Sequence, residues 1–85
     1  MKNGEKVLQR VRQWIEASPL RMTRKRERLL ETLASIDRPI PAAELRDRAG
    51  LPASDLVTVY RTLEAFEGIG IIQRIPLENS GHLYE

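Results

Sequence analysis

Apolar residues near the start of the chain recur at the spacing of an α-helix. After Asn3, which can cap a helix, one face of the first predicted helix carries Val7, Leu8, Val11, Trp14 and Ile15. Pro19 disfavours helical backbone at the residue before it, so this helix is expected to end near Ala17. The pattern therefore predicts an N-terminal helix within residues 1–17.

A second helix is predicted to begin after Thr23, whose hydroxyl suits the N-cap position. Its apolar face comprises Leu29, Leu30, Leu33 and Ile36. Four basic residues crowd its first turns: Arg24, Lys25, Arg26 and Arg28. Positive charge at this end opposes the helix dipole and costs about a few tenths of a kcal/mol per exposed residue. If the charges are solvated, this small cost needs no further explanation. If an anion docks at this end of the helix, the cluster would serve to bind it.

A short third helix is predicted over about residues 42–49. It follows a turn or short extended piece bracketed by Pro39 and Pro41, and three of its residues are available for packing: Ala43, Leu45 and Ala49. Gly50 is well placed as its C-terminal cap, and Pro52 prevents its continuation.

A fourth helix is predicted from a cap at Ser54 to about Glu67, where Gly68 and Gly70 break it. Its inward stripe, at spacings of three, four and three, comprises Leu56, Val59, Leu63 and Phe66. The short third helix, the tight turn and the longer fourth helix form a helix-turn-helix pattern.

The hydrophobic period changes after the fourth helix. Residues 69–77 are rich in β-branched side chains and predict a strand, residues 78–81 form a turn cluster, and residues 82–85 predict the returning strand. Pro76, close to the turn, favours a short or edge-like first strand.

A hairpin directly after a helix-turn-helix predicts the winged variant. The expected fold class is mainly α with a small β-hairpin, a winged helix-turn-helix of four helices followed by a two-stranded wing. One domain is expected over residues 1–85, with a helical core at 18–67 and the wing at 69–85, because 85 residues are too few for two domains.

Composition excludes several classes of protein. Cysteine is absent, which removes disulfides and thiolate metal sites and suits a reducing cytoplasm, the expected location. No apolar run approaches 18 residues and no signal-peptide core precedes the first helix, so a membrane partner is not expected. With a single histidine, no nucleophile–base pair and no phosphate-cradling glycine loop, neither an enzyme nor a cofactor is expected.

The net charge of +2 conceals an asymmetry along the chain. Residues 1–28 carry nine Lys or Arg against three Glu, whereas residues 29–85 carry five Arg against nine acidic residues. A solvated helical face accounts for such a cluster, and an anion-binding face at the N-terminal end is the sharper alternative. Composition alone slightly favours the solvated face.

The outward face of the fourth helix offers residue types that suit a DNA major groove. Helical geometry places Arg61 opposite the apolar stripe, with Val57 and Thr58 beside it and Tyr60 at the margin. Guanidinium groups bind phosphate or guanine, and small apolar groups contact thymine methyls. A packed tyrosine and a surface arginine explain the same residues about as well.

Three further arginines are candidates for contacts with DNA. Arg21 and Arg26 flank the start of the second helix, where they could hold backbone phosphates or a minor-groove edge, and Arg74 lies in the predicted wing. Each taken alone is an ordinary surface arginine, and only their joint placement around one face carries the hypothesis.

Four sequence strings resemble the ferric uptake regulator family. They are Thr-Val-Tyr-Arg-Thr-Leu-Glu at 58–64 with Gly-Ile-Ile at 70–72, Leu-Arg-Met-Thr-Arg-Lys-Arg at 20–26, Ile-Pro-Ala-Ala-Glu-Leu at 40–45 and Gly-His-Leu-Tyr-Glu at 81–85. The resemblance covers roughly residues 20–85 and implies a winged-helix transcriptional regulator that binds double-stranded DNA. In the family, residues at the positions of Tyr60, Arg61 and Arg26 contact DNA, and the basic residue at the position of Arg21 often reaches the minor groove.

The chain also departs from the family pattern. Typical members continue into a domain that dimerises and binds metal, and they often place a metal-sensing histidine where Pro39 stands here. Glu85 alone matches a ligating position and His82 is expected at the hairpin surface, so no metal site is predicted. The expectation is either a truncated DNA-binding half or a stand-alone protein without metal control.

Two further partner hypotheses remain open. A homodimer is possible, and its only spare apolar surface would be the first helix through Val7 and Trp14, whose stripe could instead serve the chain's own core. A winged-helix protein-interaction module is the alternative function. It would use the basic N-terminal helix or an acidic patch of Glu44, Asp47, Glu64 and Glu67.

Overall fold

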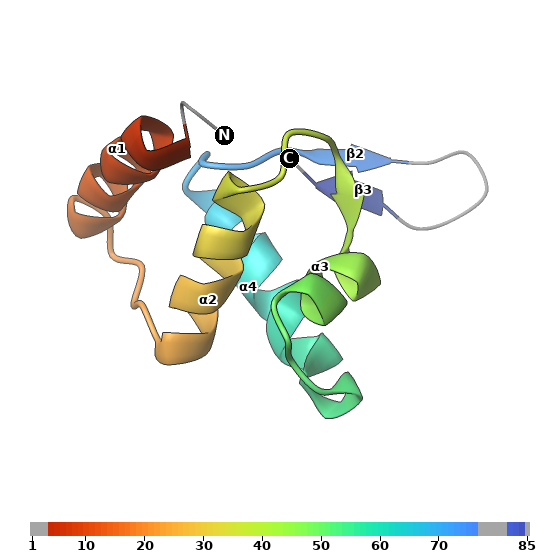
Figure 1. The fold of residues 1–85 in the computed structure, drawn as a ribbon. Coiled ribbons are helices and arrows are strands. Elements are labelled where there is room, and N and C mark those ends of the chain that lie inside the picture. Colours follow the sequence, from red (N-terminus) through yellow and green to blue (C-terminus); the bar gives the residue numbers. More distant parts are fainter. Residues whose placement is uncertain (1–3, 77–81, 85) are drawn as a thin grey trace.

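The computed structural model describes residues 4–76 and 82–84 of the 85-residue chain (Figure 1). Its elements are α1 (Gly4–Glu16), α2 (Arg24–Ala34), β1 (Ile40–Pro41), α3 (Ala42–Arg48), a 3₁₀ turn η1 (Ala53–Asp55), α4 (Leu56–Gly68), β2 (Arg74–Pro76) and β3 (His82–Tyr84). The predicted winged helix-turn-helix is confirmed, with α3 and α4 forming the motif and β2 and β3 the wing.

The turn between α3 and α4 begins as the sequence predicts and ends differently. Gly50 has a φ of 73°, which glycine adopts without a Cβ clash, and the amide of Leu51 donates to the carbonyl of Arg46 at 3.0 Å to close α3. The predicted cap at Ser54 is wrong, because Pro52 starts a 3₁₀ turn that encloses Ser54. The N-cap residue of α4 is Asp55, without a side-chain hydrogen bond to the helix.

The hydrophobic core lies where α2, α3, α4 and the sheet meet. Its buried residues are Leu29, Ile40, Ala42, Leu45, Ala49, Leu51, Val59, Leu63 and Tyr84. A second cluster of Ile15, Leu30 and Phe66 lies between α1, α2 and α4. Two predicted core residues do not lie in the core. Leu56 is only half-buried, and Ala43 is exposed whereas its neighbour Ala42 is buried.

Three antiparallel strands form the sheet in the order β1, β3, β2. The hairpin pairs Arg74 with Tyr84 and Pro76 with His82, and β1 adds a pairing of Ile40 with Tyr84. The extended piece between the two prolines is therefore part of the sheet. Pro76 lies on an edge strand, as predicted, and the predicted turn at 78–81 lies outside the described residues.

The first predicted strand, at 69–77, is too long. Gly70 has a φ of 82°, and the amide of Ile71 donates to the carbonyl of Phe66 at 3.1 Å, so these residues terminate α4. Ile69, Ile71 and Ile72 then pack against the second cluster, and within the described residues the strand starts only at Arg74.

The apolar stripe of α1 is only partly used by the chain's own core. Ile15 is buried, but Val7 is 50% exposed and Trp14 is 53% exposed. Figure 1 shows α1 beside α2 at the edge of the molecule, where Arg12 forms ion pairs with Glu27 and Glu31 of α2. A helix at an edge can bury only part of a wide stripe. No helix within the described ranges is long and apolar enough to cross a membrane.

Candidate nucleic-acid interface

An open groove separates the start of α2 from the outer side of α4. Its volume is about 320 Å³, and its lining residues are Arg21, Thr23, Arg26, Thr58, Arg61 and Thr62. We call it the α2–α4 groove. It brings together four of the seven predicted site residues, from two segments far apart in the sequence. Three guanidinium groups and the hydroxyls of Thr23 and Thr58 line its open part, which is a chemistry suited to phosphate oxygens.

The start of α2 is held in shape by its own side chains. The hydroxyl of Thr23 accepts a hydrogen bond from the amide of Arg26 at 3.2 Å, which confirms the predicted N-cap. Nη1 of Arg26 donates to the backbone carbonyl of Arg21 at 2.9 Å. This bond ties the preceding loop to the helix, and Arg26 keeps further N–H donors for the groove.

An ion pair fixes the start of α2 against the start of α4. Nζ of Lys25 lies 2.9 Å from Oδ1 of Asp55, whose side chain is 12% exposed. The Asp55 carboxylate is also favoured by its place at the N-terminus of α4. Lys25 therefore neutralises an internal carboxylate, and the basic cluster of α2 divides into a structural lysine and arginines that face outward or into the groove.

The outward face of α4 is open to solvent, as the helical arithmetic predicted. Val57 is 60% exposed and Tyr60 is 45% exposed, Arg61 is exposed and Thr58 is half-buried. No ion pair involves Arg61 within the described part of the chain. An aromatic ring, a branched apolar group, a hydroxyl and a guanidinium thus share one accessible helix face.

Arg74 stands apart from the α2–α4 groove. It lies on the wing strand β2, and its Nε is 3.5 Å from Oε2 of Glu67 on α4. Nearly half of its side chain is exposed. The ion pair fixes the wing strand to α4, and it leaves part of the guanidinium accessible.

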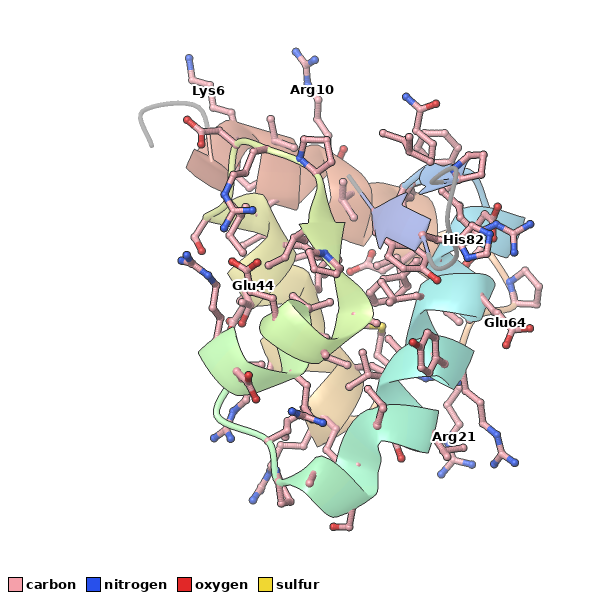
Figure 2. The ribbon with its side chains drawn as sticks, turned by 90° about the vertical axis from the view of Figure 1, so that its right-hand side faces the viewer. Lys6, Arg10, Arg21, Glu44, Glu64 and His82 are labelled. Atoms are coloured by element: carbon pink, nitrogen blue, oxygen red, sulfur yellow. The ribbon has the colours of Figure 1, made fainter. Side chains whose placement is uncertain are left out.

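The N-terminal excess of positive charge does not form one surface. Figure 2 shows Lys6 and Arg10 on α1 at the opposite end of the molecule from Arg21. Of the basic residues among the first 28, Arg21 and Arg26 line the α2–α4 groove, whereas Lys6 and Arg10 lie far from it.

The acidic residues also fail to form the single patch considered from the sequence. Glu44 and Glu64 lie on opposite sides in Figure 2. Arg38 and Arg48 pair with Glu44, and the hydrogen bond from Arg38 is the largest cause that lowers the pKa of this carboxyl below its ordinary value. Asp47 and Glu67 are paired with arginines as well.

Two groove residues were missed by the reasoning from sequence. Thr23 was assigned only a capping role, although it also lines the groove. Thr62 follows Thr58 by four positions and therefore lies on the same side of α4, which helical spacing could have indicated. It is fully buried, and its hydroxyl has no hydrogen-bond partner among the described residues.

Metal-ligating side chains do not converge in the described part of the chain. No group of three His, Cys, Asp or Glu in the described ranges could hold one, and His82 is an exposed residue of β3. A stable site needs three or four converging ligands. The chemistry of the groove is therefore that of arginines and hydroxyls.

Comparisons with known proteins agree with this fold. The solved structure of the Helicobacter pylori ferric uptake regulator Fur, described as having three functional metal-binding sites, superimposes with a TM-score of 0.69 at 24% identity. The match covers 96% of this chain and 56% of that one, so this chain spans about half the length of the H. pylori protein. No curated protein matches the sequence. The model of the ferric uptake regulator family matches residues 17–85, and the chain belongs to that family.

Proposed function

We propose that residues 1–85 act as the DNA-binding domain of a ferric uptake regulator-like transcriptional regulator, in the cytoplasm and without an enzymatic activity. The single observation that carries the proposal is the α2–α4 groove, where Arg21, Arg26 and Arg61 converge beside the exposed face of α4. Membership of a family of regulators supports it.

In this proposal α4 enters the major groove of a duplex. Tyr60, Val57 and Thr58 contact base edges, because they are the accessible aromatic, apolar and hydroxyl groups of the helix face. The groove arginines hold backbone phosphates on one side of the helix, which sets its orientation and depth.

The wing contributes a more distant phosphate contact through Arg74. Its ion pair with Glu67 holds the guanidinium near α4, and nearly half of the side chain remains exposed for contact with the duplex. One small domain reads one half-site, so pairing of two copies on adjacent half-sites would supply the affinity that one copy lacks.

The test begins with a duplex selected by the protein from a random pool, and binding is then followed by fluorescence anisotropy at several salt concentrations. Arg61→Ala and Arg26→Ala should weaken binding and leave the domain folded by circular dichroism. Loss of one phosphate contact should reduce the salt slope by about 0.9. Arg48→Ala is the matched control, because Arg48 pairs with Glu44 on the other side of the molecule.

Wild-type affinity in both groove variants would contradict the proposed docking face. No duplex binding even at low salt would instead favour the winged-helix protein-interaction module.

Tyr60→Ala tests the assignment of base contacts. The variant should lose about 1–3 kcal/mol of discrimination between the selected duplex and single-base variants, because a good base contact contributes that amount. The salt slope should remain unchanged, since no phosphate contact is removed. Unchanged sequence preference would show that the ring does not contact a base.

A further inference from the structure

The outer surface of α1 exposes large apolar side chains at a distance from the proposed DNA face. Within the described residues, four large apolar side chains are exposed: Val7, Trp14, Val57 and Tyr60. Val57 and Tyr60 belong to α4 and already take part in the proposed DNA contacts. Val7 and Trp14 lie on α1, which precedes the residues that match the family model.

The exposed residues of α1 form a stripe along one side of the helix. Val7, the half-buried Val11 and Trp14 are spaced by four and then three positions, the spacing with which one helix packs along another. The indole of Trp14 rests on Gly70, because a Cβ placed at Gly70 would lie 3.4 Å from Cζ2 of Trp14. The ring is therefore supported on one side and half open on the other, and little ordering cost remains for binding.

Positive charge borders this stripe. Lys6 and Arg10, one helical turn apart, both point away from the body of the molecule (Figure 2). Neither forms an ion pair with any carboxylate whose side chain is described. The surface thus has an apolar centre and a basic rim, which is the usual anatomy of a protein interface.

We propose that the outer surface of α1 docks an acidic amphipathic helix of a partner protein. The partner's apolar stripe packs on Val7 and Trp14, and its acidic flank meets Lys6 and Arg10. The 13 residues of α1 span about 20 Å, which matches a partner helix of three to four turns.

Two other occupants fit this surface less well. A second copy of α1 would bring two sets of the same basic residues together, and like charges across an interface disfavour binding. A duplex would neutralise the basic rim, but its phosphate backbone offers no apolar surface to Val7 and Trp14.

Trp14 is the chain's only tryptophan, so its emission reports directly on this surface. The probe is a synthetic 15-residue helical peptide with Leu at heptad positions a and d, Glu at the flanking positions and no tryptophan. The full chain should show a saturable blue shift, because the peptide removes water from the indole. The same peptide with Gln in place of Glu should bind at least about tenfold more weakly.

Variants then test both halves of the surface, with binding followed by the anisotropy of a labelled peptide. Trp14→Ala should weaken binding about thirtyfold, as expected for a central aromatic anchor. Lys6→Glu/Arg10→Glu should weaken it about tenfold or more. The matched control is Arg24→Glu/Arg28→Glu, which makes the same charge change at the same spacing on α2 and should have the smaller effect.

Several results would overturn the proposal. They are an absent blue shift, equal binding of the Glu and Gln peptides, and equal effects of the two charge reversals. A blue shift produced by protein concentration alone would assign the surface to a second copy, and one produced by duplex would assign it to DNA. None of these results bears on duplex binding through the α2–α4 groove, because separate variants test that binding.

Discussion

Replacement of Thr62 by valine should stabilise the domain. Thr62 is fully buried beneath the α2–α4 groove, and its hydroxyl has no hydrogen-bond partner among the described residues. A buried polar group left unsatisfied costs about 1–3 kcal/mol, and valine has nearly the same shape without the hydroxyl. We expect the free energy of unfolding to rise by about 1 kcal/mol, and the melting temperature by about 4–8 °C for a domain of this size.

Urea denaturation followed by circular dichroism measures this change. Thr62→Ser is the matched control, because it keeps the hydroxyl and removes the buried methyl group, so it should lower stability by about 1 kcal/mol. Duplex affinity of Thr62→Val should be unchanged, since the hydroxyl lies below the surface of the groove. A valine variant less stable than wild type would show that the hydroxyl is bonded and would refute this reasoning.

Three further predictions concern the helix-turn-helix and its supports. Lys25→Ala should lower the free energy of unfolding by about 1 kcal/mol, because Lys25 pairs with Asp55. The salt slope of duplex binding should stay unchanged. If the variant reduced that slope as much as a groove arginine variant does, this structural role would be contradicted. Gly50→Ala and Gly70→Ala should each cost about 1–2 kcal/mol in urea denaturation, because both have positive φ, and wild-type stability in either variant would count against that backbone strain. Burial raises the pKa of Tyr84 above its ordinary value of 10.0, so the unfolded chain ionises first and stability falls as pH rises past 10.0. Tyr84→Phe should show a smaller fall in urea titrations across this range, and an identical fall would disprove the effect of burial.

The helices were predictable from sequence because their signals are local. The cap at Thr23 and the left-handed Gly50 depend only on neighbouring residues, and both are confirmed. Apart from the local error at the Ser54 cap, the errors lie where distant contacts decide the structure. The segment after α4 has strand-like composition, but its Ile69, Ile71 and Ile72 pack against the cluster of Ile15, Leu30 and Phe66. The pairing of Ile40 with Tyr84 likewise joins residues far apart in sequence.

The candidate site was predictable to a similar extent. Helical geometry identified the exposed face of α4, including Tyr60 and Arg61, without knowledge of the tertiary structure. Arg21 and Arg26 were linked to that face through the family resemblance and their position. The groove itself depends on how α2 packs on α4, which the sequence does not reveal. The exposure of Trp14 was one of two alternatives, because a helical stripe does not reveal how much of it a neighbour covers.

The most direct measurement of the central claim is a residue-by-residue map of duplex contact by nuclear magnetic resonance. During titration with the selected duplex, amide signals of the residues lining the α2–α4 groove and of Val57 and Tyr60 should shift most. Signals of Lys6, Arg10 and Glu44 should remain near their starting positions, because these residues lie on other sides of the molecule. Shifts that gather on α1 or around Glu44, with the groove unaffected, would contradict the assignment of this face to DNA.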